Sequence, residues 1–331
     1  MKTISFILHG KLKRKDQLKH QINQRLSEQY KINFCETSGS GDAIHLARNI
    51  IKDRADYLIS VGGDGTINEV VNGYMNSDES LRDNVTVGIL PYGTGNDFSR
   101  TIGMRKDIEQ LAEQIENDRI KPVDIGEVQY RSFAGETRTR YYINITDLGI
   151  GGLVVKTVNK SSKILGPYLT YNKAIIQSFL TFKHKKIRLT SDSFQWEGPI
   201  LCLCMANGRY FGSGICIAPQ ADVSNGKIQI VIFGNMSLID YIKNISRIRK
   251  GEILEHPEVR YEQVRSCRIE PLDPSPALPE GEGVPARRLS TSLREGAGGW
   301  AECPVDMDGE FIGYAPVELK IHEHAVKFLM D

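Results

Sequence analysis

The chain has 331 residues, a formal net charge of +1, 40% hydrophobic residues and 25% charged residues. These values are typical of a globular protein and exclude a chain that is disordered throughout. No apolar run approaches the roughly 18 residues of a transmembrane helix, and the first residues lack the apolar region and cleavage site of a signal peptide. We therefore expect a cytoplasmic protein, and the near-zero net charge gives no reason to expect a nucleic-acid partner.

The N-terminal part of the chain alternates short apolar runs with amphipathic segments. Such alternation is typical of parallel strands joined by crossover helices, so it predicts a three-layer α/β domain. The predicted strands are Thr3–Leu8, Ile32–Glu36, Tyr57–Val61 and Val85–Leu90, and the predicted helices are Gly41–Lys52, a segment with Ile67, Val70 and Val71 on its apolar face, and Asp107–Asp118.

The pattern changes after Lys121-Pro122 to β-rich runs with turns between them, which predict a second, mostly antiparallel β domain. The predicted division is therefore 1–121 and 122–331, and the last strand is a candidate to return to the first domain. A cleft between two domains is a common place for ligands, so we expect the active site there. The predicted elements are strands at Arg140–Ile145, Lys186–Thr190, Ile200–Ala206 and Lys227–Phe233 and helices at Pro167–Phe182 and Leu238–Arg249.

The segment from Ile150 to Ser191 has no acidic residue but carries several lysines interleaved with aromatic residues. This composition suits an anionic membrane surface, so we expect peripheral membrane association. A solvated helix with a buried aromatic stripe explains the same pattern and stays open. The segment 271–302 is rich in Pro, Gly, Ser and Arg without periodicity, and it predicts a disordered insertion in a surface hairpin.

The strongest chemical signal is Gly62-Gly63-Asp64-Gly65-Thr66, which lies between a predicted buried strand and a predicted helix. Glycines at this place let backbone N–H groups approach an anion closely, and the helix N-terminus adds a favourable partial positive charge. Asp64 would face a phosphate poorly unless a divalent cation lies between them. A glycine-rich turn with a helix cap is the simpler alternative, but it does not require all of these residues.

A second glycine loop, Gly93-Thr94-Gly95-Asn96-Asp97, follows the next predicted strand and therefore lies at the same edge of the parallel sheet. Thr94 can bind a phosphate oxygen, and Asp97 can orient a hydroxyl or a metal-bound water. Asp308-Gly309-Glu310 taken alone indicates a hairpin turn. The P-loop pattern and the protein-kinase signatures are both absent from the sequence.

Together, GGDGTINE at 62–69, GTGNDFSR at 93–100 and DGE at 308–310 resemble the diacylglycerol-kinase catalytic family, which includes soluble bacterial lipid kinases and is related to sphingosine and ceramide kinases. The resemblance implies two domains with ATP and Mg²⁺ in the cleft and a lipid substrate at a membrane surface. It implies that Glu310 is the general base and that Asp64 and Asp97 serve the metal and the substrate. The implied ATP contacts are Thr37, Gly62, Gly63, Asp64, Gly65, Thr66, Ile67, Asn68, Glu69 and Thr94.

The resemblance also implies a structural Mg²⁺ whose ligands are the backbone carbonyls of Asp222 and Lys227 and the side chain of Asn225. The family usually has Asp where this chain has Asn225, and a neutral amide is a weaker ligand for a hard cation. His9 and Lys11 stand where the family usually has an Asn-Pro-type phosphate loop.

Several alternatives remain open at this point. Diacylglycerol is the expected substrate, but another glycerolipid or a sphingoid base also offers a hydroxyl. The oligomeric state is open, with a homodimer as one alternative. An NAD-kinase-like enzyme shares the first motif, and a catalytically impaired nucleotide- or lipid-binding relative is a third interpretation, because the insertion precedes Glu310 closely.

Overall fold

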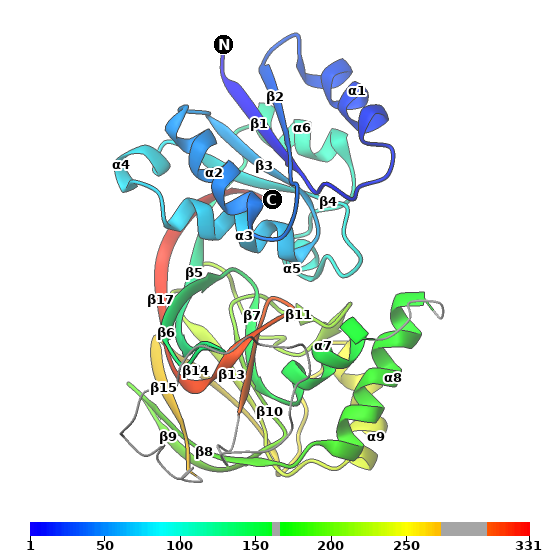
Figure 1. The fold of residues 1–331 in the computed structure, drawn as a ribbon, viewed down its shortest axis with the longest axis vertical. Coiled ribbons are helices and arrows are strands. Elements are labelled where there is room, and N and C mark those ends of the chain that lie inside the picture. The colour runs from blue at the N-terminus through cyan, green and yellow to red at the C-terminus, as the bar shows by residue number, and fades with distance from the viewer. Residues whose placement is uncertain (161–165, 273–302) are drawn as a thin grey trace, which may run out of the picture.

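The computed structural model describes residues 1–160, 166–272 and 303–331, so the predicted insertion lies almost entirely outside the described residues. The N-terminal part is an α/β unit whose parallel strands follow the order β2-β1-β3-β4. Right-handed crossovers in this order bring α1 to one face of the sheet and α2 and α3 to the other (Figure 1). Its elements are β1 (Thr3–Leu8), α1 (Lys15–Leu26), β2 (Lys31–Glu36), α2 (Asp42–Lys52), β3 (Tyr57–Gly62), α3 (Asp64–Met75), α4 (Glu79–Arg82), β4 (Thr86–Pro91), α5 (Asp97–Thr101) and α6 (Ile108–Glu116).

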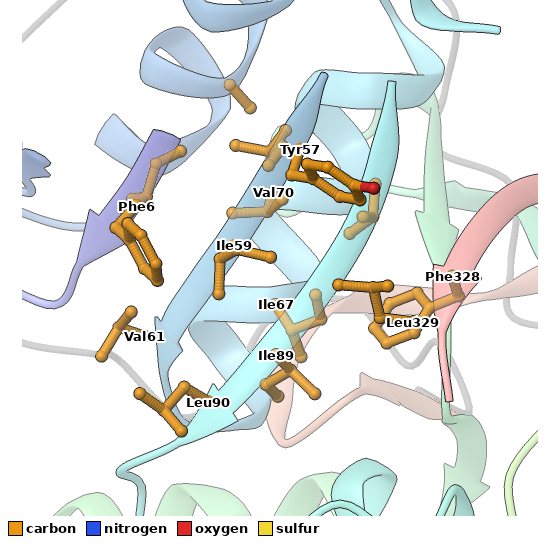
Figure 2. Packing of buried hydrophobic residues seen from close by; sticks show 14 of the residues in the cluster. Phe6, Tyr57, Ile59, Val61, Ile67, Val70, Ile89, Leu90, Phe328 and Leu329 are labelled. Carbon is orange, nitrogen blue, oxygen red and sulfur yellow. The ribbon is translucent and has the colours of Figure 1, made fainter. Parts of the chain in front are cut away.

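The core of this unit forms between the sheet and its helices. Every residue of β3 and β4 is buried, as expected for central parallel strands covered on both faces. Ile67 and Val70 of α3 are 0% exposed, which confirms the predicted apolar face of this helix. Figure 2 shows these side chains packed together with Phe328 and Leu329 from the end of the chain.

The rest of the chain forms a mostly antiparallel β unit, in which neighbouring strands follow the order β14-β13-β10-β7-β16-β17. Together with the first unit, it confirms the predicted two-domain α/β and β architecture. Three helices lie on one side of this unit (Figure 1). The strands are β5 (Ile120–Arg131), β6 (Thr137–Tyr142), β7 (Ile145–Gly149), β8 (Lys185–Ser191), β9 (Gln195–Ile200), β10 (Cys202–Ala206), β11 (Tyr210–Phe211), β12 (Ile215–Cys216), β13 (Ile228–Phe233), β14 (Val259–Val264), β15 (Ser266–Pro271), β16 (Pro304–Met307) and β17 (Glu310–Leu329), and the helices are α7 (Ile150–Lys160), α8 (Gly166–Thr181) and α9 (Leu238–Arg249).

Two long strands, β5 and β17, connect the units. They pair antiparallel from Tyr314↔Arg131 to Leu329↔Ile120, and the end of β17 pairs parallel with β4 at Phe328↔Val87. The chain therefore enters the β unit and returns from it through one two-stranded ribbon. The predicted division after residue 121 falls inside β5, and it stays a prediction.

One predicted element is wrong and one helix was not predicted. The run Arg140–Ile145, predicted as one strand, is divided between β6 and β7, because the chain changes partners there from β5 to β10 and β16. The helix α7 was not predicted, because it begins at Ile150-Gly151-Gly152, where glycine lowers helix propensity. Among the described residues, no helix is both long enough and apolar enough to span a membrane.

Candidate active site

A cleft of about 620 Å³ lies at the carboxyl edge of the parallel sheet. Loops that follow β1, β2, β3 and β4 form most of its wall, and Glu310 at the start of β17 contributes from the β unit. This is the edge at which open α/β sheets bind ligands. The structure therefore brings all three motifs of the sequence to one region, although they are separated by up to 240 positions in the chain.

The first glycine loop ends β3 and begins α3. A Cβ on Gly62 would lie 2.3 Å from the Thr66 hydroxyl oxygen, and a Cβ on Gly93 would lie 2.2 Å from the Gly63 Cα atom. The two glycine loops thus pack backbone against backbone, and these glycines are required by the fold itself. Gly65 differs, because a Cβ there would meet nothing within 4 Å.

Gly65 therefore has no packing reason to lack a side chain. It lines the cleft in the first turn of α3, where N–H groups lack an acceptor four residues earlier in the helix, although the Thr66 N–H donates to the Gly63 carbonyl at 3.0 Å. A bare backbone at a helix N-terminus is a favourable place for an anion. Packing therefore explains Gly62 and Gly93 but not Gly65, which is the candidate for a ligand contact.

The predicted nucleotide contacts divide into two groups. Thr37, Thr66, Glu69 and Thr94 line the cleft together with the glycines. Glu69 also fixes the start of α2, because its carboxylate accepts the backbone N–H groups of residues 41 and 43 at 2.7 and 3.1 Å.

Three predicted contacts do not line this cleft. Asp64 lines the neighbouring pocket together with Asp97 and Asp308. The side chain of Ile67 is 0% exposed in the core, and Asn68 is buried and donates to the Asp308 carboxylate at 2.7 Å. Thr37 accepts the backbone N–H of Gly10 at 2.9 Å, so its hydroxyl joins the loops after β1 and β2.

Two carboxylates, Asp64 and Asp97, converge over Gly95. A Cβ on Gly95 would lie 3.0 Å from an Asp64 oxygen and 3.3 Å from an Asp97 oxygen. Asp97 accepts the backbone N–H groups of Ser213 and Gly214 at 2.9 and 2.7 Å, which ties α5 to the β unit. Burial, together with the charge of Asp64, raises the pKa of Asp97 to about 6.

The Asp-Gly-Glu turn joins β16 to β17 and connects the units. Asp308 has a left-handed backbone with a φ of 47°, and its carboxylate accepts the N–H of Ile145 at 2.8 Å as well as the Asn68 amide. Burial raises the pKa of Asp308 to about 6. Two residues later, Glu310 lies 3.1 Å from the Arg140 guanidinium, and its side chain is 40% exposed toward the cleft.

The arrangement separates the roles of the two acidic residues in this motif. The Asp308 carboxylate is occupied by structural hydrogen bonds, whereas Glu310 forms an ion pair with Arg140 through one oxygen and faces the cleft. Arg140 was not singled out from the sequence, because it lies in a strand without a motif. Arg140 becomes a neighbour of Glu310 only because the fold brings β6 beside the Asp-Gly-Glu turn.

The Asp222 and Asn225 side chains of the predicted metal loop are engaged in hydrogen bonds with backbone N–H groups of the same loop. The Asn225 side-chain oxygen accepts the N–H of Lys227 at 3.0 Å, and Asp222 accepts the N–H of Ser224 at 3.0 Å. The nearby Asp124 carboxylate is consumed by the N–H groups of Gly226 and residue 324 at 2.6 and 2.7 Å. A hard cation prefers several free carboxylate oxygens, and no group of three or more acidic, His or Cys side chains suited to a metal occurs among the described residues.

Comparisons with known proteins agree with this geometry. Residues 6–128 match the family model of the diacylglycerol kinase catalytic domain, and residues 144–330 match that of the YegS C-terminal NAD kinase beta sandwich-like domain. A diacylglycerol kinase of Bacillus subtilis (strain 168) is 28% identical over 254 residues, which cover 75% of this chain and 78% of that protein. The "Probable lipid kinase YegS-like" of Klebsiella pneumoniae (strain 342) is 28% identical over 236 residues, covering 70% of this chain and 74% of that protein.

A solved structure shares the fold. The crystal structure of a diacylglycerol kinase from Bacillus anthracis str. Sterne superposes with a TM-score of 0.65 at 19% identity, covering 100% of this chain and 97% of that one. The fold and the two matched domains define a lipid kinase with a two-domain catalytic body. The chain belongs to the diacylglycerol kinase and YegS-like lipid kinase family.

Proposed function

We propose that this enzyme transfers the γ-phosphate of ATP, as its Mg²⁺ complex, to a hydroxyl of a lipid, and that diacylglycerol is its substrate. The observation that carries the proposal is that the bare helix N-terminus at Gly65 and the carboxylate of Glu310 line one cleft. One element suits an anionic phosphate chain, and the other suits a proton acceptor. A phosphotransferase needs both within reach of one reacting centre.

In this mechanism the protein mainly positions its substrates. Backbone N–H groups of residues 62–66 hold the phosphates, and the loops after β1 and β2 enclose the rest of the nucleotide. Mg²⁺ that arrives with ATP screens the phosphate charge. Asp64 has one oxygen engaged by the Phe98 N–H at 3.0 Å, which leaves the other to face the substrate complex.

Glu310 takes the proton as the lipid oxygen attacks the γ-phosphorus, and the bond from that phosphorus to the β-phosphate oxygen breaks to release ADP. Arg140 orients the Glu310 carboxylate, since the guanidinium donates to both Glu310 and Asn68 at 3.1 and 3.2 Å. The product is a phosphorylated lipid, and the proton leaves through the open side of Glu310. Diacylglycerol suits an entrance beside the acidic Asp64, Asp97 and Asp308, which would repel an anionic head group.

A lipid substrate has to reach the cleft from a bilayer, and we propose peripheral association through α8 and α9. These helices are in contact, with the rings of Phe179 and Tyr241 5.3 Å apart. They expose large apolar side chains, with Leu180 at 75% and Ile239 at 63% exposed. Lysines on the same two helices and just after them suit an anionic membrane surface.

The test is to incubate the protein with γ-labelled ATP and either vesicles that contain diacylglycerol or NAD. We expect label in the lipid, at least 100-fold less label with Asp64→Ala, and unchanged label with Asp53→Ala, whose side chain is exposed after α2. Labelled NAD, or Asp64→Ala activity within a few-fold of the parent, would reject the proposal.

A further inference from the structure

The turn that carries Glu310 is closed by a side chain outside the three motifs. Asp306, at the end of β16, accepts the N–H of Gly309 at 3.0 Å. The pairing of β16 with β17 shifts register between Val305 and Asp306, so the chain bulges where the turn begins. The conformation of the turn therefore depends on the orientation of one carboxyl group.

Directly opposite Asp306 on the neighbouring strand β7 lies a second acid, Asp147. The two residues are 3% and 1% exposed. One oxygen of Asp306 and both oxygens of Asp147 are buried without a hydrogen-bond partner among the described residues. A buried polar atom without a partner is costly, and an ionised one is far more costly.

Within the part of the chain that the structure describes, no cationic side chain forms an ion pair with either acid. The groups that face them are the thiols of Cys202 and Cys204 on β10, the thiol of Cys303 before β16, and the acids Asp308 and Glu310 of the turn. The charge of Lys185 partly opposes the rise in the pKa of Cys303 that burial causes. Burial is the main cause that raises the pKa of both Asp147 and Asp306 above the ordinary value.

A glycine at the start of α7 leaves space for the Asp147 carboxyl group. A Cβ on Gly151, in the first turn of α7, would lie 2.0 and 2.2 Å from the two Asp147 oxygens. The carboxyl group of Asp147 therefore packs on bare backbone, where no other residue type fits. The Asp147 carboxyl group thus depends on a glycine at position 151.

We propose that Asp147 and Asp306 form a protonated carboxyl pair that fixes the Asp-Gly-Glu turn and thereby positions Glu310 for phosphoryl transfer. A protonated carboxyl is a donor as well as an acceptor, so one hydrogen bond between the acids gives a partner to one oxygen of each, and the second Asp147 oxygen packs against Gly151. One oxygen of Asp306 accepts the Gly309 N–H, and in this proposal the other oxygen shares a proton with the Asp147 carboxyl group. Both acids are positioning residues, and the inference rests on the proposed function of Glu310.

The test uses kinetics with ATP and diacylglycerol vesicles. Asp306→Ala removes the acceptor for Gly309, and we expect kcat to fall at least tenfold while the KM for ATP stays within twofold. Asp306→Asn and Asp147→Asn keep an acceptor and carry permanent N–H donors, and we expect both within about threefold of the parent at neutral pH. At alkaline pH the parent should lose activity as the pair ionises, and the Asp147→Asn/Asp306→Asn variant should lose less.

An infrared measurement separates this inference from the proposed function. The parent at neutral pH should show the carbonyl band of a buried protonated carboxylic acid, and the double Asn variant should lack it. If no lipid is phosphorylated, the proposed function fails while the band still tests the pair. A parent without the band, or folded Asp306→Ala with parental kcat, would overturn the inference. The first of these outcomes can be read from the parent even if the variants do not fold.

Discussion

The substitution Gly65→Ala should change the stability of the protein and its affinity for Mg–ATP in opposite directions. The residue lies in α3 without a left-handed φ, and an added Cβ meets no atom within 4 Å. Alanine is favoured over glycine in a helix by about 0.5–1 kcal/mol. We therefore expect the variant to be more stable by about that amount, with a rise in Tm of about 2 °C.

The same methyl group would occupy the space in which the phosphates approach the backbone. We expect the Kd for Mg–ATP to rise at least about tenfold, a loss of about 1.4 kcal/mol. Titration calorimetry and thermal unfolding on the same sample measure both quantities. A variant that is more stable and binds Mg–ATP like the parent would refute the claim that Gly65 contacts the nucleotide.

Gly73→Ala is the matched control in the same helix. A Cβ there would lie 2.5 Å from the Ile44 carbonyl oxygen and 2.7 Å from the Ala47 Cβ, so α3 would be pushed away from α2. We expect this variant to lose stability by about 1–3 kcal/mol, as overpacked sites do. Its remaining folded fraction should bind Mg–ATP with the parental Kd.

Four further predictions follow from the site. Glu310→Gln should lower kcat at least about 100-fold, the usual contribution of a general base, while calorimetry shows parental Mg–ATP binding; a loss of binding instead would contradict its assignment as base. For Asp97, whose pKa rises from 3.8 to about 6, the folded state holds a proton that the unfolded chain releases between those pH values, so stability falls on raising the pH through this window by about 3 kcal/mol at 1.36 kcal/mol per pH unit. Denaturant titrations of Asp97→Asn should lack this fall, and an equal pH dependence in both proteins would refute it. Leu180→Asn with Ile239→Asn should weaken co-sedimentation with anionic vesicles at least about fivefold without changing Mg–ATP affinity, since burying one large apolar side chain contributes about 1.5–3 kcal/mol; unchanged sedimentation would exclude this surface. Asn225→Asp should give a rise in Tm on adding Mg²⁺ that exceeds the rise in the parent, because a carboxylate is a better ligand for this cation; equal shifts would show that the loop takes no metal in either form.

The sequence predicts the α/β unit well because its signals are local. Continuous apolar runs define β1 and β3, and in the β unit α9 has the predicted bounds. The glycine motif at 62–66 lies between strand and helix as predicted, because the backbone freedom that an anion requires is itself a local property. Such features need no information about distant parts of the chain.

The features that the sequence did not predict depend on distant pairings. Arg140 meets Glu310 across 170 positions, and Asp147 meets Asp306 only through the register of β7 with β16. The helix α7 begins with two glycines that helix propensity opposes, and Gly151 is explained only by the carboxyl group packed on it. Tertiary contacts override local preference at each of these places.

The central claim is that the glycine loop and α3 hold the triphosphate of ATP. The most direct measurement is calorimetric titration of the folded protein with Mg–ATP. The structure predicts saturable binding to one site per chain and a stabilisation of the protein that increases with Mg–ATP concentration. The absence of both heat and thermal shift in well-folded protein would contradict the claim, and with it the assignment of the cleft.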